Sequence, residues 1–386
     1  MHITDDIIYI GVEDHEIDLF EGQYKVPDGM RYNSYLIKAD KIAVMDTVEA
    51  GFKDEWLANM EAALEGKTPD YLIVQHMEPD HSSNIFAFVE KYPEAKIVGN
   101  AKTFTMIKNF YRNVELEDKM VTVTNGEVFS LGNHELKFVF APMVHWPEVM
   151  ITYDMTDEVL FTADGFGTFG TGEEDPATWK AEASRYYFGI VGKYGNQVQK
   201  LLKDISTFTA EHICSLHGPV LNGDIGWYIE QYANWSSYTA EKEGVLIAYT
   251  SVYGNTEKAV NLLADKLREK GCADVKVMDL ARCDMSKAVA EAFLYGKMVL
   301  ATTTYNGTIF PFMKEFIDHL TERGFKDRTI GIIENGSWAS QAGRVMKKML
   351  ETSKDITWME NEVKLTSSVS EANVEEIERL ADELLA

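Results

Sequence analysis

The sequence predicts an α/β protein with two units: an αββα sandwich of mixed strands and helices, followed by a doubly wound parallel sheet. Three observations support this prediction. The length of 386 residues is enough for two domains. Before residue 244, apolar strand-like runs follow one another with helical patterns between only some of them. After residue 244, strands and helices alternate regularly. We therefore expect domains at 1–243 and 244–386.

In the first unit, apolar runs bounded by polar or turn-forming residues are expected to form strands. In the second unit, Val260, Leu263 and Leu267 recur at helical spacing, and a helical stretch at 227–238 precedes the boundary. The expected strands of the first unit are 7–12, 34–37, 42–46, 71–75, 136–140, 149–153 and 159–163. Those of the second are 245–249, 275–278, 298–301 and 329–333, with a final acidic helix at about 371–385.

Composition and charge exclude several classes of protein. A formal net charge of −25 disfavours nucleic acid as a partner, because both molecules would be negatively charged. No apolar run approaches the roughly 18 residues that span a membrane, and residues 1–9 lack the pattern of a secretory signal. We therefore expect a cytoplasmic protein that binds neither membrane nor nucleic acid.

The cysteines also limit the chemistry. Cys214, Cys272 and Cys283 have no CxxC spacing, which argues against a disulfide framework, a thiolate zinc site and an iron–sulfur cluster. Any metal must then be held mainly by histidine and carboxylate side chains.

One short segment carries the strongest metal-binding signal. The apolar run at 71–75 leads directly into His76, Glu78, Asp80 and His81. Pro79 is expected to keep a helix from running through the segment, and in an extended chain alternate residues point to one side. The segment is therefore a candidate half of a metal site.

Three further candidate ligands follow similar strand ends. They are His145 after 138–140, Asp164 after 159–163, and His217 before a Gly-Pro pair. Together with the first segment, they give four histidines and three carboxylates. A carboxylate such as Asp164 can bridge two ions, which in two-metal sites lie roughly 3.5–4 Å apart.

The second unit opens with a candidate phosphate-binding loop. A strand leads into hydroxyl side chains, a glycine and the start of a helix, where backbone N–H groups bind phosphate. The loop has no P-loop lysine, which suits a single phosphate monoester such as that of FMN. The residues of this loop are Ser251, Val252, Tyr253, Gly254, Asn255 and Thr256.

Two more loops at later strand ends are expected to contact the flat flavin ring, because they combine aromatic and small polar residues. Their candidate residues are Thr303, Thr304, Tyr305, Asn306 and Gly307 in one loop, and Gly336, Ser337 and Trp338 in the other.

Both units resemble known superfamilies. The first metal segment is similar to the His-x-His-x-Asp-His motif of the metallo-β-lactamase fold, with Glu78 in place of the second histidine. The extra carboxylate favours iron or manganese over zinc. The loop 251–256 resembles the flavodoxin phosphate loop, with Tyr253 in place of a threonine. In this order, a metallo-β-lactamase-like domain and a flavodoxin-like domain resemble the flavodiiron proteins, also called A-type flavoproteins.

This resemblance implies a role for each candidate ligand. His76, Glu78 and His145 would hold one iron, and Asp164 would bridge to the other. The second iron would be held by Asp80, His81 and His217. Trp146 and Tyr194 are expected to line the substrate pocket.

The resemblance further implies a cytoplasmic oxidoreductase that reduces dioxygen to water, nitric oxide to nitrous oxide, or both. The electrons would reach the diiron site through FMN from an external donor, either rubredoxin or a reduced deazaflavin. A head-to-tail homodimer, or a dimer of such dimers, is expected. Three alternatives remain open: a di-metal hydrolase with a flavodoxin-like appendage, a non-catalytic electron-carrier flavoprotein, and a diiron enzyme acting on peroxide.

Overall fold

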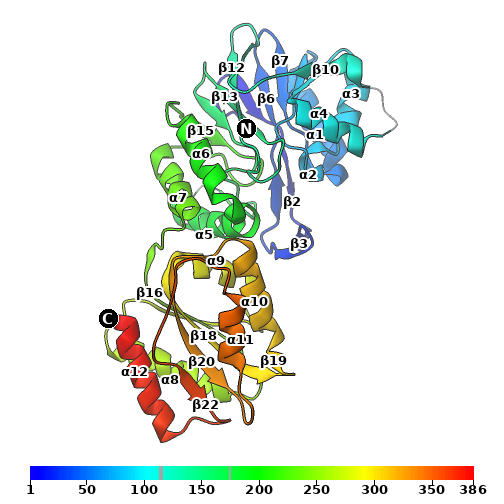
Figure 1. Ribbon diagram of the computed structural model, residues 1–386. Coiled ribbons are helices and arrows are strands. Elements are labelled where there is room, and N and C mark those ends of the chain that lie inside the picture. The colour runs from blue at the N-terminus through cyan, green and yellow to red at the C-terminus, as the bar shows by residue number, and fades with distance from the viewer. Residues whose placement is uncertain (113–115, 174) are drawn as a thin grey trace. The chain divides into compact units, whose positions relative to one another are not determined.

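The structure, a computed structural model, describes residues 1–112, 116–173 and 175–386. Contacts divide the described chain into two compact units (Figure 1). These units are defined by contacts, and the domain boundary that we expect after residue 243 stays a prediction. The first unit comprises Met1–Tyr187 and Asn196–Ala233, and the second comprises Phe188–Gly195 and Asn234–Ala386.

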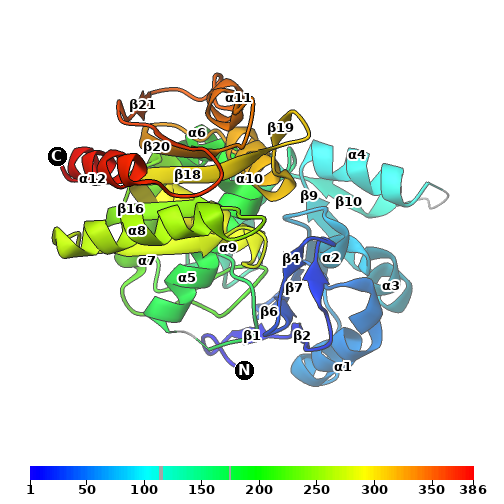
Figure 2. The ribbon, with the colours of Figure 1, turned by 90° about the horizontal axis from the view of Figure 1, so that it is seen from below.

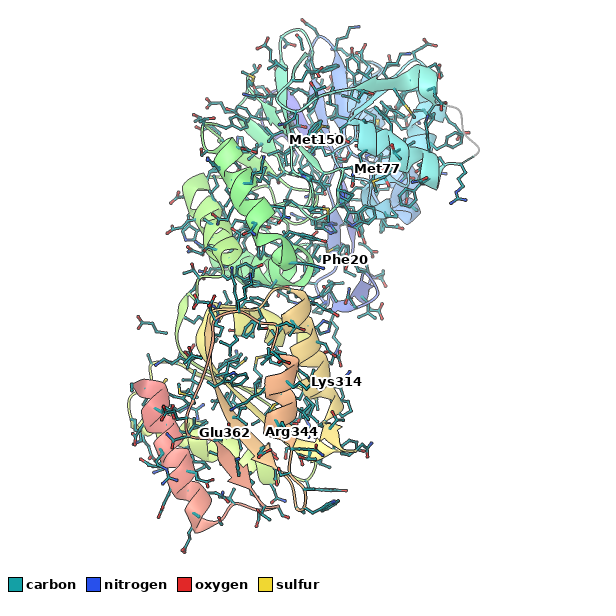
Figure 3. All side chains as sticks on the ribbon, in the orientation of Figure 1. Phe20, Met77, Met150, Lys314, Arg344 and Glu362 are labelled. Atoms are coloured by element: carbon teal, nitrogen blue, oxygen red, sulfur yellow. The ribbon has the colours of Figure 1, made fainter. Side chains whose placement is uncertain are left out.

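Two sheets of the first unit pack face to face. Ile37 and Met45 of one sheet and Phe138 and Met150 of the other belong to one buried cluster (Met150 is labelled in Figure 3). This arrangement confirms the predicted α/β sandwich. In spatial order, one sheet contains β1 (Ile7–Tyr9), β6 (Tyr35–Lys38), β7 (Ile42–Met45), β8 (Tyr71–Ile73), β9 (Lys96–Gly99) and β10 (Met120–Thr122). The other contains β11 (Val128–Ser130), β12 (Glu135–Phe140), β13 (Met150–Asp154), β14 (Val159–Phe161) and β15 (His212–Cys214).

Two small hairpin-like pairs and a set of helices complete the first unit. The pairs are β2 (Val12–Asp14) with β5 (Met30–Tyr32), and β3 (Leu19–Phe20) with β4 (Tyr24–Lys25). The helices are η1 (Ala50–Phe52), α1 (Lys53–Leu64), α2 (Pro79–Ser82), α3 (Ile85–Lys91), α4 (Ala101–Phe110), η2 (Glu117–Lys119), α5 (Pro176–Tyr186), α6 (Gly195–Ile205) and α7 (Ile225–Ser237). Between α5 and α6 lie the π-helical turn η3 (Tyr187–Val191) and the 3-10 helix η4 (Gly192–Tyr194). The segment Phe188–Gly195 and the end of α7 from Asn234 count with the second unit.

The second unit is built on a parallel sheet. Its strand order places the first strand of the unit between the second and the third, which is the doubly wound arrangement that the sequence predicted. The short β19 (Thr308–Ile309) pairs antiparallel with the end of β18. In spatial order, the sheet contains β17 (Val275–Asp279), β16 (Lys242–Tyr249), β18 (Tyr295–Tyr305) and β20 (Arg328–Asn335), followed by β21 (Ile356–Trp358) and β22 (Val363–Leu365), which both pair with β20.

Helices cover both faces of this sheet (Figure 2). α8 (Asn255–Glu269) and α12 (Glu371–Leu385) pack together on one face, where their apolar side chains share a buried cluster with β16 and β18. α9 (Met285–Leu294), α10 (Pro311–Glu322) and α11 (Ala342–Met349) pack side by side in that order. Because the strands are parallel, the carboxyl ends of β16, β18 and β20 meet at one edge of the sheet.

No helix in the described part of the chain combines the length and the apolar character needed to cross a membrane.

Candidate metal centre and flavin-binding loops

The side chains that the sequence singled out for metal binding gather in the first unit, in the segments that follow β8, β12, β14 and β15. They form two groups whose potential ligand atoms all lie within 4.8 Å of one another inside each group. The groups are His76, Glu78, His145 and Asp164, and Asp80, His81 and His217.

The segment after β8 turns sharply at Pro79. This proline is the first residue of α2, and Glu78 precedes it as the N-cap residue. Our prediction of an extended segment is therefore wrong. Proline is disfavoured inside a helix but suits its first turn, where its missing N–H has no helical partner. The turn places Glu78 in the first group and Asp80 in the second.

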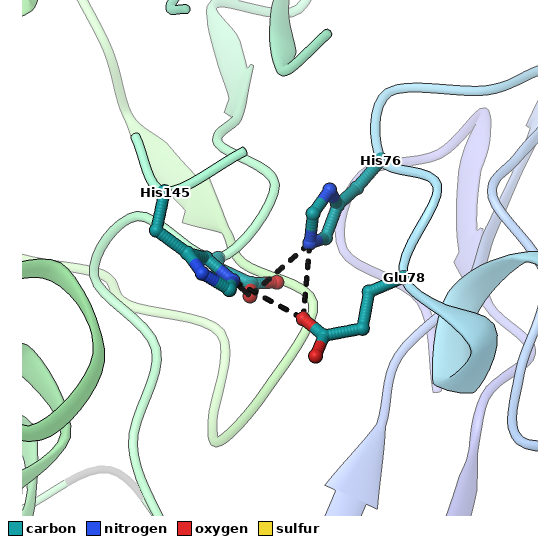
Figure 4. A group of neighbouring side chains, drawn as sticks. His76, Glu78 and His145 are labelled. Atoms are coloured by element: carbon teal, nitrogen blue, oxygen red, sulfur yellow. Dashed lines mark hydrogen bonds and ion pairs between the residues drawn. The ribbon is translucent and has the colours of Figure 1, made fainter. Parts of the chain in front are cut away.

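The first group is a tight cluster of imidazole nitrogens and carboxylate oxygens (Figure 4). Oε2 of Glu78 lies 3.2 Å from Nε2 of His76 and 3.1 Å from Nε2 of His145. Oδ2 of Asp164 lies 2.9 Å from Nε2 of His145 and 3.6 Å from Nε2 of His76. Four donor atoms from three separate segments thus face a common point.

The second group has the same character. Oδ2 of Asp80 lies 3.3 Å from Nε2 of both His81 and His217. The two Nε2 atoms are 2.9 Å apart. Three donor atoms again converge on one point.

Asp164 joins the two groups through its two oxygens. Its Oδ2 belongs to the first group, at 2.9 Å from His145. Its Oδ1 lies 3.9 Å from Nε2 of both His81 and His217 in the second group. One carboxylate placed between two donor sets suits a bridge between two metal ions.

Bound metal cations explain this cluster of donor atoms better than hydrogen bonds among its own side chains do. Both oxygens of Asp80 and Oδ1 of Asp164 are buried and have no hydrogen-bond partner within the described part of the chain. Buried polar atoms rarely lack a partner, so such atoms call for an explanation by an ion or another bound group. Four imidazoles and three carboxylates form a mixed nitrogen and oxygen set, which suits iron.

Opposing effects set the pKa values in the first group. Burial lowers the pKa of His145, but Asp164 and Glu78 outweigh burial and raise it to about 9. Burial raises the pKa of Glu78, but hydrogen bonds from His145 and His76 outweigh it and lower it to about 2. Glu78 therefore stays ionised at neutral pH, as a metal ligand must be.

Two of the candidate ligands are oriented through their other ring nitrogen. Nδ1 of His76 lies 2.9 Å from Oε1 of Glu148. Nδ1 of His217 lies 2.8 Å from the backbone carbonyl of Arg31. Such contacts fix the ring and leave Nε2 free to face a metal.

The two predicted pocket residues differ in their placement. The ring of Trp146 lies 5.3 Å from that of His76 and 6.2 Å from that of His145, so it borders the first group. Tyr194 ends η4, a segment that counts with the second unit, whereas every candidate ligand belongs to the first. Its predicted place in the pocket stays a prediction.

Two aromatic residues beside the metal groups were missed by the sequence analysis. The buried hydroxyl of Tyr186 donates to Oδ2 of Asp164 at 3.0 Å. Phe20, labelled in Figure 3, places its ring 5.2 Å from that of His217. Tyr186 ends a long helix and Phe20 belongs to a two-residue strand, so neither stands in a motif that could have identified it.

The candidate phosphate loop connects β16 to α8. Gly254 is the N-cap residue of α8 and has a left-handed backbone with a φ of 83°. Its N–H donates to Oγ of Ser251 at 3.0 Å. The side chain of Tyr253 is 91% exposed. The loop therefore presents the N-terminus of α8 at the sheet edge, as phosphate binding requires.

The second candidate flavin segment differs from the predicted loop. β18 continues to Tyr305, so Thr303 and Thr304 lie on a strand. The turn to β19 is formed by Asn306 and Gly307, which both have positive φ. The strand outlasts its apolar run because β19 supplies an antiparallel partner, which the sequence pattern did not reveal. Oγ1 of Thr304 accepts a hydrogen bond from the N–H of Gln341 at 3.0 Å, which ties this segment to the start of α11.

The third candidate segment follows β20 and holds an exposed aromatic side chain. Trp338 is 82% exposed, and Ser337 lies in the same loop. A segment that the sequence did not single out adjoins this loop, because Oγ of Ser367 lies 2.6 Å from Oγ of Ser337. The candidate residues at the ends of β16, β18 and β20 thus meet at one edge of the sheet, and their contact with FMN stays a prediction.

Comparisons with known proteins also distinguish a first part of the chain, which holds the metal groups, from a second part, which holds the candidate flavin loops. Residues 30–218 match the family model described as ODP family beta lactamase, and residues 246–373 match a flavodoxin domain. The chain is 30% identical over 361 residues to "Nitric oxide reductase" of Moorella thermoacetica, covering 91% of this chain and 90% of the relative. It is 28% identical over 349 residues to "Anaerobic nitric oxide reductase flavorubredoxin" of Vibrio vulnificus, covering 88% and 70%.

Solved structures show the same architecture. Rubredoxin oxygen:oxidoreductase from Desulfovibrio gigas matches with a TM-score of 0.92 and 25% identity, covering 100% of this chain and 97% of that one. The flavodiiron protein from Giardia intestinalis has a TM-score of 0.92 at 24% identity, covering 99% and 96%, which supports the fold alone.

Proposed function

This chain belongs to the flavodiiron protein family, and from that membership we propose that it reduces nitric oxide, dioxygen or both. The protein is an oxidoreductase with FMN and two non-haem irons as cofactors. The names of its relatives support both substrates, since one is a nitric oxide reductase and another an oxygen oxidoreductase. These relatives do not favour a hydrolase or a plain electron carrier.

In this proposal, each metal group holds one iron. His76, Glu78 and His145 hold the first, and Asp164 is shared with the second. The observation that carries the assignment is the position of Asp164, whose Oδ2 lies 2.9 Å from Nε2 of His145 while its Oδ1 lies 3.9 Å from Nε2 of His217. The remaining ligands of the second iron are Asp80, His81 and His217.

When bound, the irons and FMN supply the electrons that reduce a diatomic substrate. The protein side chains orient the ligands, limit access of water and hold a proton. Tyr186 keeps its hydroxyl proton next to Asp164, because burial raises the pKa of Tyr186 well above its ordinary value and the neighbouring carboxylate adds to the effect. The rings of Tyr186 and Phe20 flank His217 at 5.6 Å and 5.2 Å and shield that side of the site from water.

The flavin is proposed to bind at the edge formed by the carboxyl ends of β16, β18 and β20. The phosphate would lie on the N-terminus of α8, at Ser251, Gly254 and Thr256. The ring would contact the exposed aromatic side chains of Tyr305 and Trp338.

The direct test measures turnover together with cofactor content. Protein purified without oxygen is reduced and supplied with nitric oxide or dioxygen, and consumption is followed with the corresponding electrode. Asp164→Asn should lose iron and turnover of either substrate while keeping FMN. Asp154→Asn is the matched control, because Asp154 is also a buried carboxylate bonded to a histidine but lies in neither metal group. Full iron and full turnover in Asp164→Asn would contradict the assignment.

We also propose an external electron donor, either rubredoxin or a reduced deazaflavin. The names of the relatives from Desulfovibrio gigas and Vibrio vulnificus, which both refer to rubredoxin, support the first choice. Reoxidation of reduced rubredoxin by the protein in the presence of substrate tests it. A head-to-tail homodimer, or a dimer of dimers, and a cytoplasmic location belong to the same proposal. Light scattering on the purified protein tests the oligomeric state.

The domain assignment is part of the proposal as well. Residues 1–243 are the diiron domain and residues 244–386 the FMN domain. The ranges matched by the two family models, 30–218 and 246–373, support this division.

A further inference from the structure

The loop between β12 and β13 carries a buried carboxylate that no metal group contains. Glu148 lies in this loop, three residues after His145, and its side chain is 0% exposed. The loop is closed by the bond from the N–H of Ala141 to the carbonyl of Val149 at 2.8 Å. Asn100 donates to the backbone carbonyl of Glu148 at 2.6 Å. The backbone around Glu148 is therefore held from two sides.

The same loop is tied to the segment that carries His76. The N–H of Met150 donates to the carbonyl of Gln75 at 3.1 Å. Oε1 of Glu148 lies 2.8 Å from the backbone nitrogen of Met77 and 2.9 Å from Nδ1 of His76. Met77 and Met150 are labelled in Figure 3. Glu148 is thus hydrogen-bonded both to the ring of His76 and to the backbone N–H of the next residue.

These bonds determine which nitrogen of His76 carries the proton. A backbone N–H can only donate, so the contact with Met77 marks Oε1 of Glu148 as an acceptor. His76 then donates from Nδ1 to the same oxygen. Nε2 is then the nitrogen whose lone pair would be offered to a bound metal, and it lies among the other ligand atoms of the first group, 3.2 Å from Oε2 of Glu78 and 3.6 Å from Oδ2 of Asp164. The bond to Glu148 therefore directs the lone pair of His76 into the first metal group.

The second oxygen of Glu148 has a different environment. Oε2 is buried and has no hydrogen-bond partner among the described residues. A carboxylate that served only to close the loop would be expected to use both oxygens, because an unpaired buried oxygen is costly. The unpaired oxygen is consistent with a carboxylate whose negative charge acts on His76 as a metal ligand.

We propose that Glu148 is a positioning residue, which fixes His76 with Nε2 toward the first iron and makes this imidazole a more electron-rich ligand. This inference rests on the proposed metal centre. An electron-rich ligand stabilises the oxidised iron, so loss of the Glu148 charge should raise the reduction potential of the site. A residue that served only the fold would leave that potential unchanged.

The test compares three variants with the unmutated holoprotein. Glu148→Gln keeps the shape and an acceptor for His76 and Met77 but removes the charge. Glu148→Ala removes the acceptor as well, and Asp154→Asn is the control. In the control pair, Oδ2 of Asp154 lies 2.7 Å from Nδ1 of the buried His134, outside both metal groups. The readouts are iron per chain, and the midpoint potential of the iron pair from a redox titration followed by electron paramagnetic resonance.

Glu148→Gln should retain iron and shift the midpoint potential to a more positive value. A tenfold change in the ratio of oxidised to reduced iron corresponds to about 59 mV for a one-electron couple. Glu148→Ala should bind iron roughly 10–100-fold more weakly. Asp154→Asn should change neither quantity. An unchanged potential in Glu148→Gln, or an equal shift in Asp154→Asn, would overturn the proposal.

A measurement on the unmutated protein covers the case in which Glu148→Gln does not fold. In protein loaded with zinc, which is diamagnetic, the Nδ1 proton of His76 should give a slowly exchanging imidazole signal in nitrogen-edited proton NMR spectra. A signal from His76 that places the proton on Nε2 would overturn the proposal. The failure of the proposed function is distinguishable, because the unmutated protein itself would then bind no iron pair.

Discussion

The hydroxyl of Tyr186 lies 3.0 Å from Oδ2 of Asp164, the same oxygen that lies 2.9 Å from Nε2 of His145. The proposed bridging carboxylate is therefore held by a buried phenol on the side of the first metal group. Among the described residues, Oδ2 of Asp164 has two hydrogen-bond partners, which are Nε2 of His145 and the hydroxyl of Tyr186.

Tyr186→Phe should reduce turnover without emptying the site. The substitution removes one hydrogen bond to a buried carboxylate, while the seven proposed ligands remain. We expect turnover of nitric oxide or dioxygen to fall by roughly 10–100-fold, with iron and FMN content unchanged. Tyr153→Phe is the control, because the hydroxyl of Tyr153 donates to the backbone carbonyl of Thr209 at 2.5 Å and Tyr153 lies in neither metal group. Full turnover in Tyr186→Phe would refute the role of this hydroxyl.

Gly254→Val should weaken FMN binding and leave iron in place. Gly254 has a φ of 83°, and an added Cβ would meet only Oε2 of Glu257 at 3.8 Å, so backbone strain rather than crowding disturbs the loop. Such strain costs on the order of 1–3 kcal/mol, which would raise the Kd for FMN roughly 5–150-fold if all of it falls on the bound form. Titration of the flavin-free protein with FMN, followed by flavin fluorescence, measures the change.

Gly271→Val is the matched control for the phosphate loop. Gly271 has a φ of 87°, lies just beyond the other end of α8 and has open space where a Cβ would be added. Gly271→Val introduces the same kind of strain away from the loop and should keep its FMN affinity, whereas Gly254→Val should lose FMN. Equal FMN affinity in the two variants would show that the loop does not bind the phosphate.

Trp338→Ala should weaken flavin binding with little effect on stability. The side chain is 82% exposed and so contributes little to the core of the second unit. Stacking between aromatic rings is worth roughly 0.5–1.5 kcal/mol, which corresponds to about a 2–12-fold rise in the Kd for FMN. Phe110→Ala, at an exposed aromatic residue of the first unit, is the control. An unchanged Kd in Trp338→Ala would exclude ring contact at this position.

The stability of the first unit should decrease as the pH rises from about 6.5 to about 9. The hydrogen bond with Asp154 raises the pKa of His134 to about 9, although burial opposes it. Because the folded pKa is above the unfolded value of about 6.5, the stabilisation is complete below pH 6.5 and is lost as the pH rises through 9. It amounts to roughly 3 kcal/mol for this buried side chain.

Urea unfolding at several pH values measures this contribution. His134 also lies 3.3 Å from Oδ2 of Asp6, so its charge is paired with two carboxylates. His134→Gln should be less stable than the unmutated protein at pH 6.5, and the difference should shrink by pH 9. A difference that is equal at both pH values would contradict the account.

Much of the fold and most of the metal groups could be predicted from local patterns. Polar ligand-type residues that follow apolar strands indicated the metal segments, although β8 belongs to one sheet of the sandwich and β12, β14 and β15 belong to the other. The final helix was predicted at 371–385 and is observed at Glu371–Leu385. Its start is marked by a reciprocal cap between Ser370 and Asn373, which is a local signal.

The contacts that support the metal groups were not predictable, because they join distant parts of the chain. Tyr186 is 22 residues from Asp164, and Glu148 is 72 residues from His76. Arg31 contributes only a backbone carbonyl to His217, which leaves no trace in side-chain patterns. The prediction for the segment around Pro79 was wrong for another reason, because proline was treated as a residue that prevents a helix, whereas here it begins one.

Metal and flavin content of protein purified without oxygen tests the central claim most directly. Elemental analysis and absorbance should give about two irons and one FMN per chain, as a two-metal site beside a flavin domain requires. Zinc in the metal groups of protein produced with ample iron, or a chain without FMN, would contradict the account.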